Sequence, residues 1–112
     1  MKLPGADKIM VEREKIVEYL LNAMHPDNGG KARFFLDLGF DRNDWQPLAA
    51  ALIKACESHP VSKTVASPHG MKYIVDVRIE TPVGKRPMVR TLRIVDLGLD
   101  RPRLVTASPR EE

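Results

Sequence analysis

The segment Pro102-Arg103-Leu104-Val105-Thr106-Ala107-Ser108-Pro109 has the pattern of a short β-strand bounded by prolines. Its central residues are apolar or β-branched and suit a pleated, half-buried surface, whereas proline cannot donate to a strand ladder and marks where pairing starts and stops. Because side chains alternate along a strand, the hydroxyls of Thr106 and Ser108 should share one face. Arg103 and Ala107 are expected on the opposite face. A strand this short needs neighbours, so we expect it to close a sheet.

The residues before this segment supply those neighbours, because the hydrophobic pattern has a period of two from residue 61 onward. Strands are predicted over 61–67, 71–81 and 88–96, joined by turns at 67–70 and 82–85. In the strand over 88–96, Leu92 and Ile94 are expected on the apolar face, opposite Thr91 and Arg93. The four consecutive strands predict an antiparallel meander.

The first half of the chain has helical periodicity instead. A helix is predicted over 11–24 with Leu20 and Met24 on its apolar face, followed by a break at 25–30. A short helix over 30–38 buries Ala32 and Phe35, and a third helix, capped by Asp41 or Asn43, ends before residue 60. The predicted fold class is α+β, with two or three N-terminal helices packed on one face of the four-stranded sheet.

The length and composition favour one domain, residues 1–112, with an ordered core at about 8–109. No apolar run reaches the roughly 20 residues of a membrane span, and no secretory signal is visible, so we expect a cytoplasmic protein. The histidines and the single Cys56 do not have zinc-ligand spacing, and no cofactor motif occurs. The net charge of +3 favours polyanionic partners.

Two stretches resemble a bacterial domain family found beside small partner genes and as the C-terminal module of large polymorphic toxins. The first contains Tyr19-Leu20-Leu21-Asn22, His25-Pro26, Lys31-Ala32-Arg33-Phe34-Phe35, Leu38-Gly39-Phe40 and Trp45. The second contains His69-Gly70-Met71-Lys72-Tyr73, Thr81-Pro82-x-Gly84, Arg90-Thr91-x-x-Ile94-Val95 and the segment 102–109. Together these motifs span nearly the whole chain.

The resemblance implies the ribonuclease fold shared by the barnase, EndoU, colicin and RelE group, and metal-independent cleavage of RNA. It also implies a cognate antitoxin or immunity protein, which a basic catalytic face would require to be acidic. Members of the family usually end in Thr-Ala-Tyr-Pro, whereas this chain has Ser108 at the aromatic position. The hydroxyl is kept but a ring able to stack on a base is absent.

Metal-free RNA cleavage needs a base, an acid and cations that stabilise charge on the phosphate. Histidine titrates near neutral pH, so His69 and His25 are the candidate proton carriers. The other catalytic candidates are Lys72, Arg90 and Thr106. The candidates for substrate binding are Lys31, Arg93 and Ser108.

Each candidate also has a purely structural interpretation. His69 could be a turn residue, His25 a helix-terminal residue, and Lys31 an ordinary solvated lysine. Lys72 and Arg93 would lie on the polar face of any meander, Arg90 could form an ion pair, and Thr106 is a good strand former. The alternative function is therefore a non-catalytic protein- or RNA-binding module of the same fold, and a third is a structural subunit.

Overall fold

A computed structural model of the chain describes residues 3, 5, 9–24 and 29–110. The element order is helices first and then strands. The helices are the π-helical segment η2 (Lys15–Leu20), α1 (Gly29–Asp37) and α2 (Gln46–Ser58). The strands are β1 (Lys63–Ser67), β2 (Gly70–Arg78), β3 (Met88–Asp96) and β4 (Pro102–Pro109).

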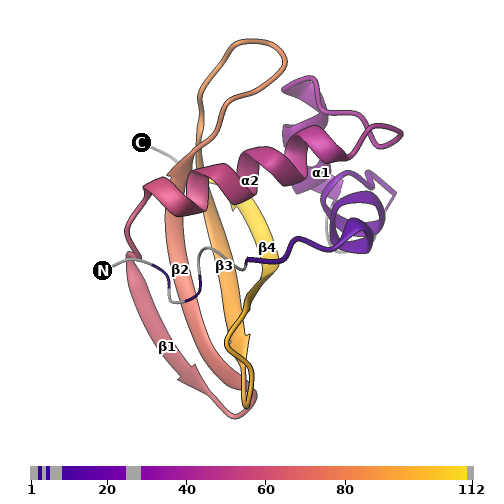
Figure 1. Cartoon of the computed structure of the whole chain (residues 1–112). Helices are drawn as coiled ribbons and strands as arrows, with labels where there is room; N and C mark the ends of the chain where they lie inside the picture. The colour runs from indigo at the N-terminus through magenta and orange to yellow at the C-terminus, as the bar shows by residue number, and fades with distance from the viewer. Residues whose placement is uncertain (1–2, 4, 6–8, 25–28, 111–112) are drawn as a thin grey trace.

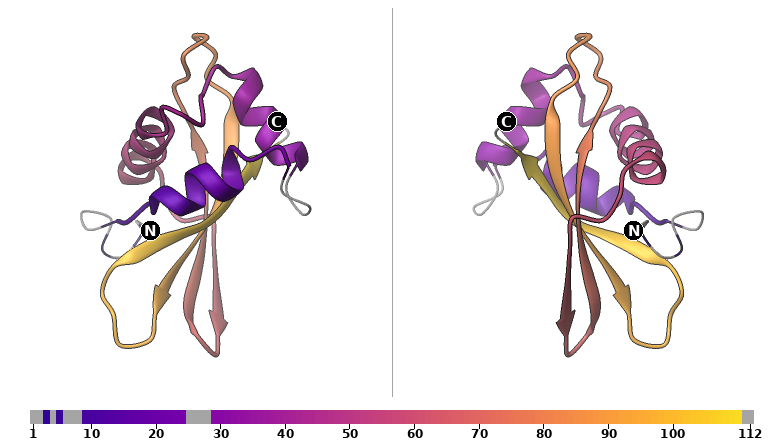
Figure 2. Two further views of the ribbon diagram at one scale, coloured as in Figure 1. Left: turned by 90° about the vertical axis from the view of Figure 1, so that its right-hand side faces the viewer. Right: turned by 90° about the vertical axis from the view of Figure 1, so that its left-hand side faces the viewer.

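The strands form one antiparallel sheet in the order β1-β2-β3-β4, which confirms the predicted α+β fold. The helix α2 crosses one face of the sheet, here called the inner face (Figure 1). The segments η2 and α1 lie beside β4 at the edge of the sheet (Figure 2). The opposite, outer face is the one that α2 does not cover.

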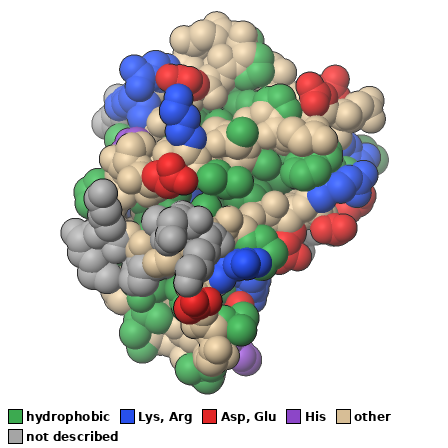
Figure 3. Space-filling view, viewed as in Figure 1, with side chains coloured by type: hydrophobic (Ala, Val, Ile, Leu, Met, Phe, Trp, Pro, Cys, Tyr) green, Lys and Arg blue, Asp and Glu red, His purple; other side chains and the backbone are tan. Residues whose placement is uncertain are grey.

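Alternating apolar residues explain why the sheet packs against the helices. On β2, Val75 and Val77 are fully buried, and Ala32 and Phe35 of α1 are buried as predicted. The main core cluster joins Val75, Val77 and Phe35 to apolar residues of η2, α2, β3 and β4: Ile16, Leu20, Leu48, Leu52, Val89, Leu104 and Ala107. On the face where α2 lies, hydrophobic side chains form a band flanked by charged ones (Figure 3).

The predicted orientation of β3 is wrong. Thr91 and Arg93 are buried on the inner face, whereas Leu92 lies on the outer face and is half-buried. The Arg93 guanidinium donates from Nη2 to the Leu52 carbonyl of α2 at 3.1 Å and from Nε to Thr91 Oγ1 at 3.2 Å. A long side chain with an apolar stem can thus occupy a core position that hydropathy assigns to solvent.

The predicted helix over 11–24 is shorter in the structure. Helical backbone covers residues 13–20, and Met24 is 89% exposed rather than part of the apolar face. Its C-terminal break falls partly on residues 25–28, outside the described residues. None of the helices within the described ranges has the length and apolar character that a bilayer crossing demands.

Candidate active site at the β4 edge

The ammonium group of Lys31 lies between two hydroxyl groups at the β4 edge of the sheet. Its Nζ donates to Thr106 Oγ1 at 3.1 Å and to the Tyr19 hydroxyl at 3.4 Å. The same Nζ lies 5.6 Å from the centre of the Tyr19 ring, and Lys15 Nζ lies 5.1 Å from it. All of these side chains are partly exposed, so the cluster is open to solvent.

Each member of this cluster is held by buried neighbours on its own element. Lys31 precedes the buried Ala32 in α1, and Tyr19 precedes the buried Leu20 in η2. Thr106 is placed by an irregularity in β4: Leu92 pairs with Thr106, but the next residue, Arg93, pairs with Leu104. Thr106 and Ser108 pair with Leu92 and Arg90 on the same side of this bulge, so they share the outer face as predicted.

The bulge also changes the orientation of the start of β4. Arg103 pairs with Ile94 and binds Asp96 through two hydrogen bonds, so it lies on the outer face with Thr106 and not opposite to it. The alternation rule fails here because it assumes an unbroken strand.

The electrostatic environment favours ionisation of the phenol. The hydrogen bond with Thr106 and the neighbouring Lys31 lower the pKa of Tyr19 below the ordinary value of 10.0, against partial burial, which raises it. A phenol whose pKa is lowered gives up its proton more readily, as a general acid must. A hollow of about 400 Å³ reaches Tyr19 from solvent; it is lined by Glu12, Glu14, Lys15, Glu18, Tyr19 and Arg103.

Cationic side chains from β2 and β3 occupy the outer face next to the cluster. The strand register places Ser108 opposite Arg90, and Arg90 opposite Asp76 of β2. Lys72 points to the same face, two residues before Ile74, and is half-buried. The predicted residues Lys72, Arg90, Thr106 and Ser108 therefore lie on one face, with Lys31 at its edge.

The remaining candidates lie elsewhere. Arg93 points into the core, where its side chain is 0% exposed, so it is not on the substrate-accessible face that we expected. His69 is exposed in the β1–β2 turn, next to Gly70, which pairs with Asp96 at the end of β3. Asp96 is four residues from Leu92, or about 13 Å along the strand, so His69 is distant from Thr106. His25 lies outside the described residues.

The sequence matches a family model over nearly its whole length. The family is described as a domain of unknown function (DUF6883), and its model matches residues 2–111. The chain belongs to this family. No curated protein matches it.

A structural comparison shows where the fold of this DUF6883 member recurs. The chain is similar to a chain in a solved structure described as a contact-dependent growth inhibition toxin–immunity protein complex from Klebsiella pneumoniae 342. The TM-score is 0.72 at 19% sequence identity, covering 96% of this chain and 98% of that one. At this level of identity the likeness establishes a shared fold.

Sequence reasoning did not select Tyr19 as a functional residue of this family member. The tyrosine belongs to one of the recognised motifs, but it stands in a predicted helix beside apolar Leu20 and Leu21, and no role was assigned to it. The family resemblance could have pointed to it, because Tyr19 lies in one of the same set of motif segments as Lys31 and Thr106.

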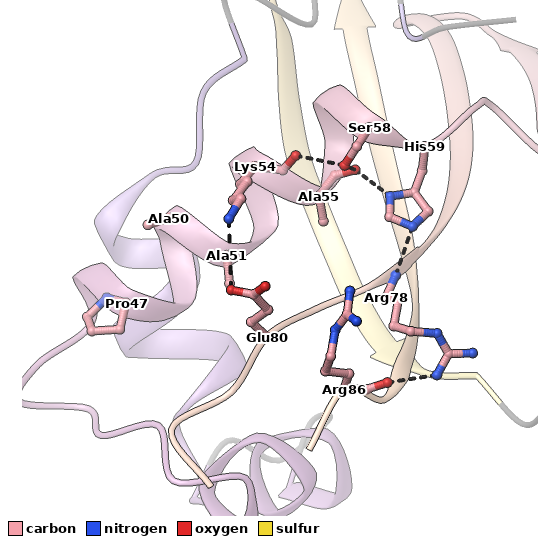
Figure 4. Close-up of a pocket in the computed structure, with 10 residues that line it drawn as sticks. All are labelled: Pro47, Ala50, Ala51, Lys54, Ala55, Ser58, His59, Arg78, Glu80 and Arg86. Carbon is pink, nitrogen blue, oxygen red and sulfur yellow. Dashed lines mark hydrogen bonds and ion pairs between the residues drawn. The ribbon is translucent and has the colours of Figure 1, made fainter. Parts of the chain in front are cut away.

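A second hollow, of about 320 Å³, lies between α2 and the β2–β3 connection, and its lining includes no residue of η2, α1, β3 or β4 (Figure 4). His59, which follows α2, lines this hollow and is half-buried. Its Nδ1 lies 2.7 Å from the Ala55 carbonyl, and its Nε2 accepts from the Arg78 amide at 3.3 Å. This histidine ties the end of α2 to β2.

No group of three or more His, Cys, Asp or Glu side chains in the described part of the chain is arranged to hold a metal ion. Cys56 is buried on α2, and burial raises the pKa of its thiol. A buried thiol that resists ionisation is a packing group rather than a nucleophile.

Proposed function

We propose that the chain is a toxin domain that cleaves RNA without a metal ion and is neutralised by a cognate immunity protein. The observation that carries this proposal is the position of Lys31 between the Tyr19 and Thr106 hydroxyls, beside a cationic sheet face. The fold shared with a chain of a toxin–immunity complex supports the toxin role. The motif resemblance supports RNA as the substrate.

The proposed reaction is attack of a ribose 2′-oxygen on the adjacent phosphorus. A base removes the 2′ proton, the new P–O bond forms, and the bond to the 5′-oxygen breaks as that oxygen takes a proton from an acid. Lys31 stabilises the negative charge that builds up on the phosphate oxygens, and Thr106 holds the ammonium in place. The Tyr19 phenol supplies the proton, because its pKa is lowered.

The proton acceptor in this scheme stays a prediction from the sequence. His25 is the better of the two histidine candidates, because it follows η2 in the chain and Tyr19 belongs to η2. The position of His69 in the β1–β2 turn favours a role outside the reactive centre.

The outer sheet face also defines the expected chemistry of the partner. Basic residues of this face outnumber its acids, and Asp76 and Asp96 are each already bound to arginine. The basic residues are Lys63, Lys72, Arg78, Arg90, Arg103 and Arg110. An acidic immunity protein seated on this face would exclude RNA from it.

A non-catalytic binding module of the same fold is the alternative, and Ser108 is the observation that favours it. This residue replaces the family aromatic directly beside Arg90 on the outer face. Loss of base stacking would weaken RNA binding by about 1–3 kcal/mol. The alternative predicts a stable complex with a partner and no cleavage.

Expression in bacteria without the partner gene separates the two functions. The toxin should arrest growth, and Lys31→Ala should restore it while the protein stays folded. Lys54→Ala is the matched control, since Lys54 is an exposed lysine on α2 that pairs with Glu80 at 3.8 Å. This control should remain toxic. Healthy cells containing abundant folded wild-type protein would refute the proposal.

A further inference from the structure

Two arginines on the outer face share one carboxylate. Asp76 Oδ1 accepts from Arg90 Nε at 2.8 Å, and Asp76 Oδ2 accepts from Arg90 Nη2 at 3.1 Å. Arg110 Nε donates to the same Oδ2 at 3.0 Å. The Arg110 amide also bonds the Met88 carbonyl at 3.0 Å, which fixes the backbone beyond β4. Both guanidinium groups are therefore held at one point.

The burial of these groups shows which of them face outward. The Asp76 side chain is 15% exposed, whereas those of Arg90 and Arg110 are 43% and 44% exposed. Within the described ranges, Arg90 Nη1 and both terminal nitrogens of Arg110 have no hydrogen-bond partner. The Asp76 carboxylate is thus the most buried of the three groups, and the unused donors of both arginines are available on the solvent side of it.

The charge of this group differs from that of an ordinary ion pair. One carboxylate faces two guanidiniums, so a positive charge is left over at the surface. On the same face, Arg103 binds Asp96 with similar distances, 2.8 Å and 3.2 Å, but one to one. That pair is neutral and provides an internal comparison.

We propose that Arg90 and Arg110 form a subsite for a backbone phosphate of single-stranded RNA, with Asp76 as the positioning residue. Guanidinium forks match phosphate oxygens in a planar, two-bond geometry. Ser108, opposite Arg90 in the register, adds a hydroxyl donor. Ser108 follows Thr106 by two residues, about 7 Å along the strand, so RNA at the Lys31–Thr106 cluster also passes over this subsite.

This inference rests on the proposed function, and its test uses a probe that the toxin cannot cut. A labelled 2′-O-methyl oligonucleotide lacks the free 2′-hydroxyl, so its binding, followed by fluorescence anisotropy, reports recognition alone. Asp76→Asn should weaken binding several-fold although it removes a negative charge. The matched control Asp96→Asn removes the same charge from the neutral pair and should bind as tightly as wild type or more tightly.

Arg110→Gln tests the subsite just beyond the last strand, at a side chain that is 44% exposed. Loss of one phosphate contact should lower the slope of log affinity against log salt by about 0.7. Asp76→Glu should recover part of the affinity lost in Asp76→Asn, and measuring the binding well below the melting temperature of every variant excludes an indirect effect of stability.

The inference is overturned if Asp76→Asn binds the oligonucleotide as tightly as Asp96→Asn, or if wild type does not bind it. Loss of poly-glutamate binding in Arg110→Gln with unchanged oligonucleotide binding would also overturn it, and would assign the subsite to an acidic protein. Weakened oligonucleotide binding in a chain that never cuts RNA would support the subsite and reject the proposed function. RNA cleavage by the chain, together with unchanged oligonucleotide binding in Asp76→Asn and Arg110→Gln, would support the proposed function and reject the subsite.

Discussion

The Lys31 ammonium contacts the Thr106 hydroxyl at 3.1 Å although 75 residues separate the two in the sequence. The contact joins α1 to β4, and the Tyr19 hydroxyl, 3.4 Å from the same ammonium, adds η2. Buried residues hold both elements: Phe35 in α1 and Ala107 in β4 belong to the same core cluster. The cluster of polar groups therefore exists only in the folded chain.

The acidity of Tyr19 should depend on its two polar neighbours. Thr106→Val keeps the shape of the side chain but removes the hydroxyl, and the hydrogen bond with Thr106 is the largest cause that lowers the Tyr19 pKa. We expect phenolate formation, followed by ultraviolet absorbance, to move to higher pH in this variant. Tyr19→Phe should abolish that transition, and an unchanged titration in Thr106→Val would contradict the geometry of the cluster.

The buried Arg93 should make the folded protein less stable than an apolar side chain of similar volume would at the same position. Its side chain is fully buried, Nη1 has no partner, and desolvation lowers the pKa of the guanidinium. Arg93→Met fills a similar volume with apolar atoms, so the free energy of unfolding should rise by about 1 kcal/mol or more. Arg93→Ala leaves a cavity and should lower it. Denaturant unfolding measures both, and a destabilised Arg93→Met would show that the guanidinium is needed in the core.

The ion pairs of Asp76 should appear in acid unfolding. The hydrogen bonds from Arg90, and less strongly from Arg110, lower the pKa of Asp76 in the folded chain. The resulting stabilisation is complete above the unfolded pKa of about 3.9 and is lost as the pH falls through the lower folded pKa. Asp76→Asn should therefore lose less stability than wild type between about pH 4 and pH 2. Asp37→Asn removes an exposed carboxylate of α1 and is the charge-matched control. The wild-type slope in Asp76→Asn would count against the pairing.

Gly70 should be intolerant of a side chain. Its φ is +150°, and an added Cβ would overlap the Val95 carbonyl oxygen and crowd Asp96 Cα at 2.9 Å. Gly70→Ala should cost more than about 2 kcal/mol of unfolding free energy. Gly84, with φ of +82° and open space around it, is the matched control, and Gly84→Ala should cost only about 1 kcal/mol from strain. Equal losses would mean that the β1–β2 turn is not as tight as described.

Periodicity predicted the elements and their order because burial of one face dominates each of them. The alternation of Val75 and Val77 on β2 and the spacing of Ala32 and Phe35 on α1 are examples. The orientation of β3 was not predictable in the same way. Both of its faces mix apolar and polar residues, and Arg93 is buried by contacts with α2 that no local pattern contains.

The candidate site was predicted in part. Lys31 and Thr106 were selected separately, and the structure brings them together, while Lys72, Arg90 and Ser108 share the adjoining face. The bulge that places Thr106 is a tertiary feature of the β3–β4 pair, and Tyr19 was hidden by its neighbours in the hydrophobic run. Asp76 and Arg110 gain their meaning only from the fold: the register sets Asp76 opposite Arg90, and Arg110 donates to the same carboxylate.

The most direct test of the proposed function is cleavage of single-stranded RNA by the purified chain in the presence of a metal chelator. We predict fragments ending in a 2′,3′-cyclic phosphate. The cleavage rate of Lys31→Ala should be lower than that of wild type by a factor of about 100 or more, and the rate of Lys54→Ala should be unchanged. Equal cleavage by folded Lys31→Ala, or no cleavage by folded wild-type protein, would contradict the assignment of Lys31, Thr106 and Tyr19 as the reactive centre.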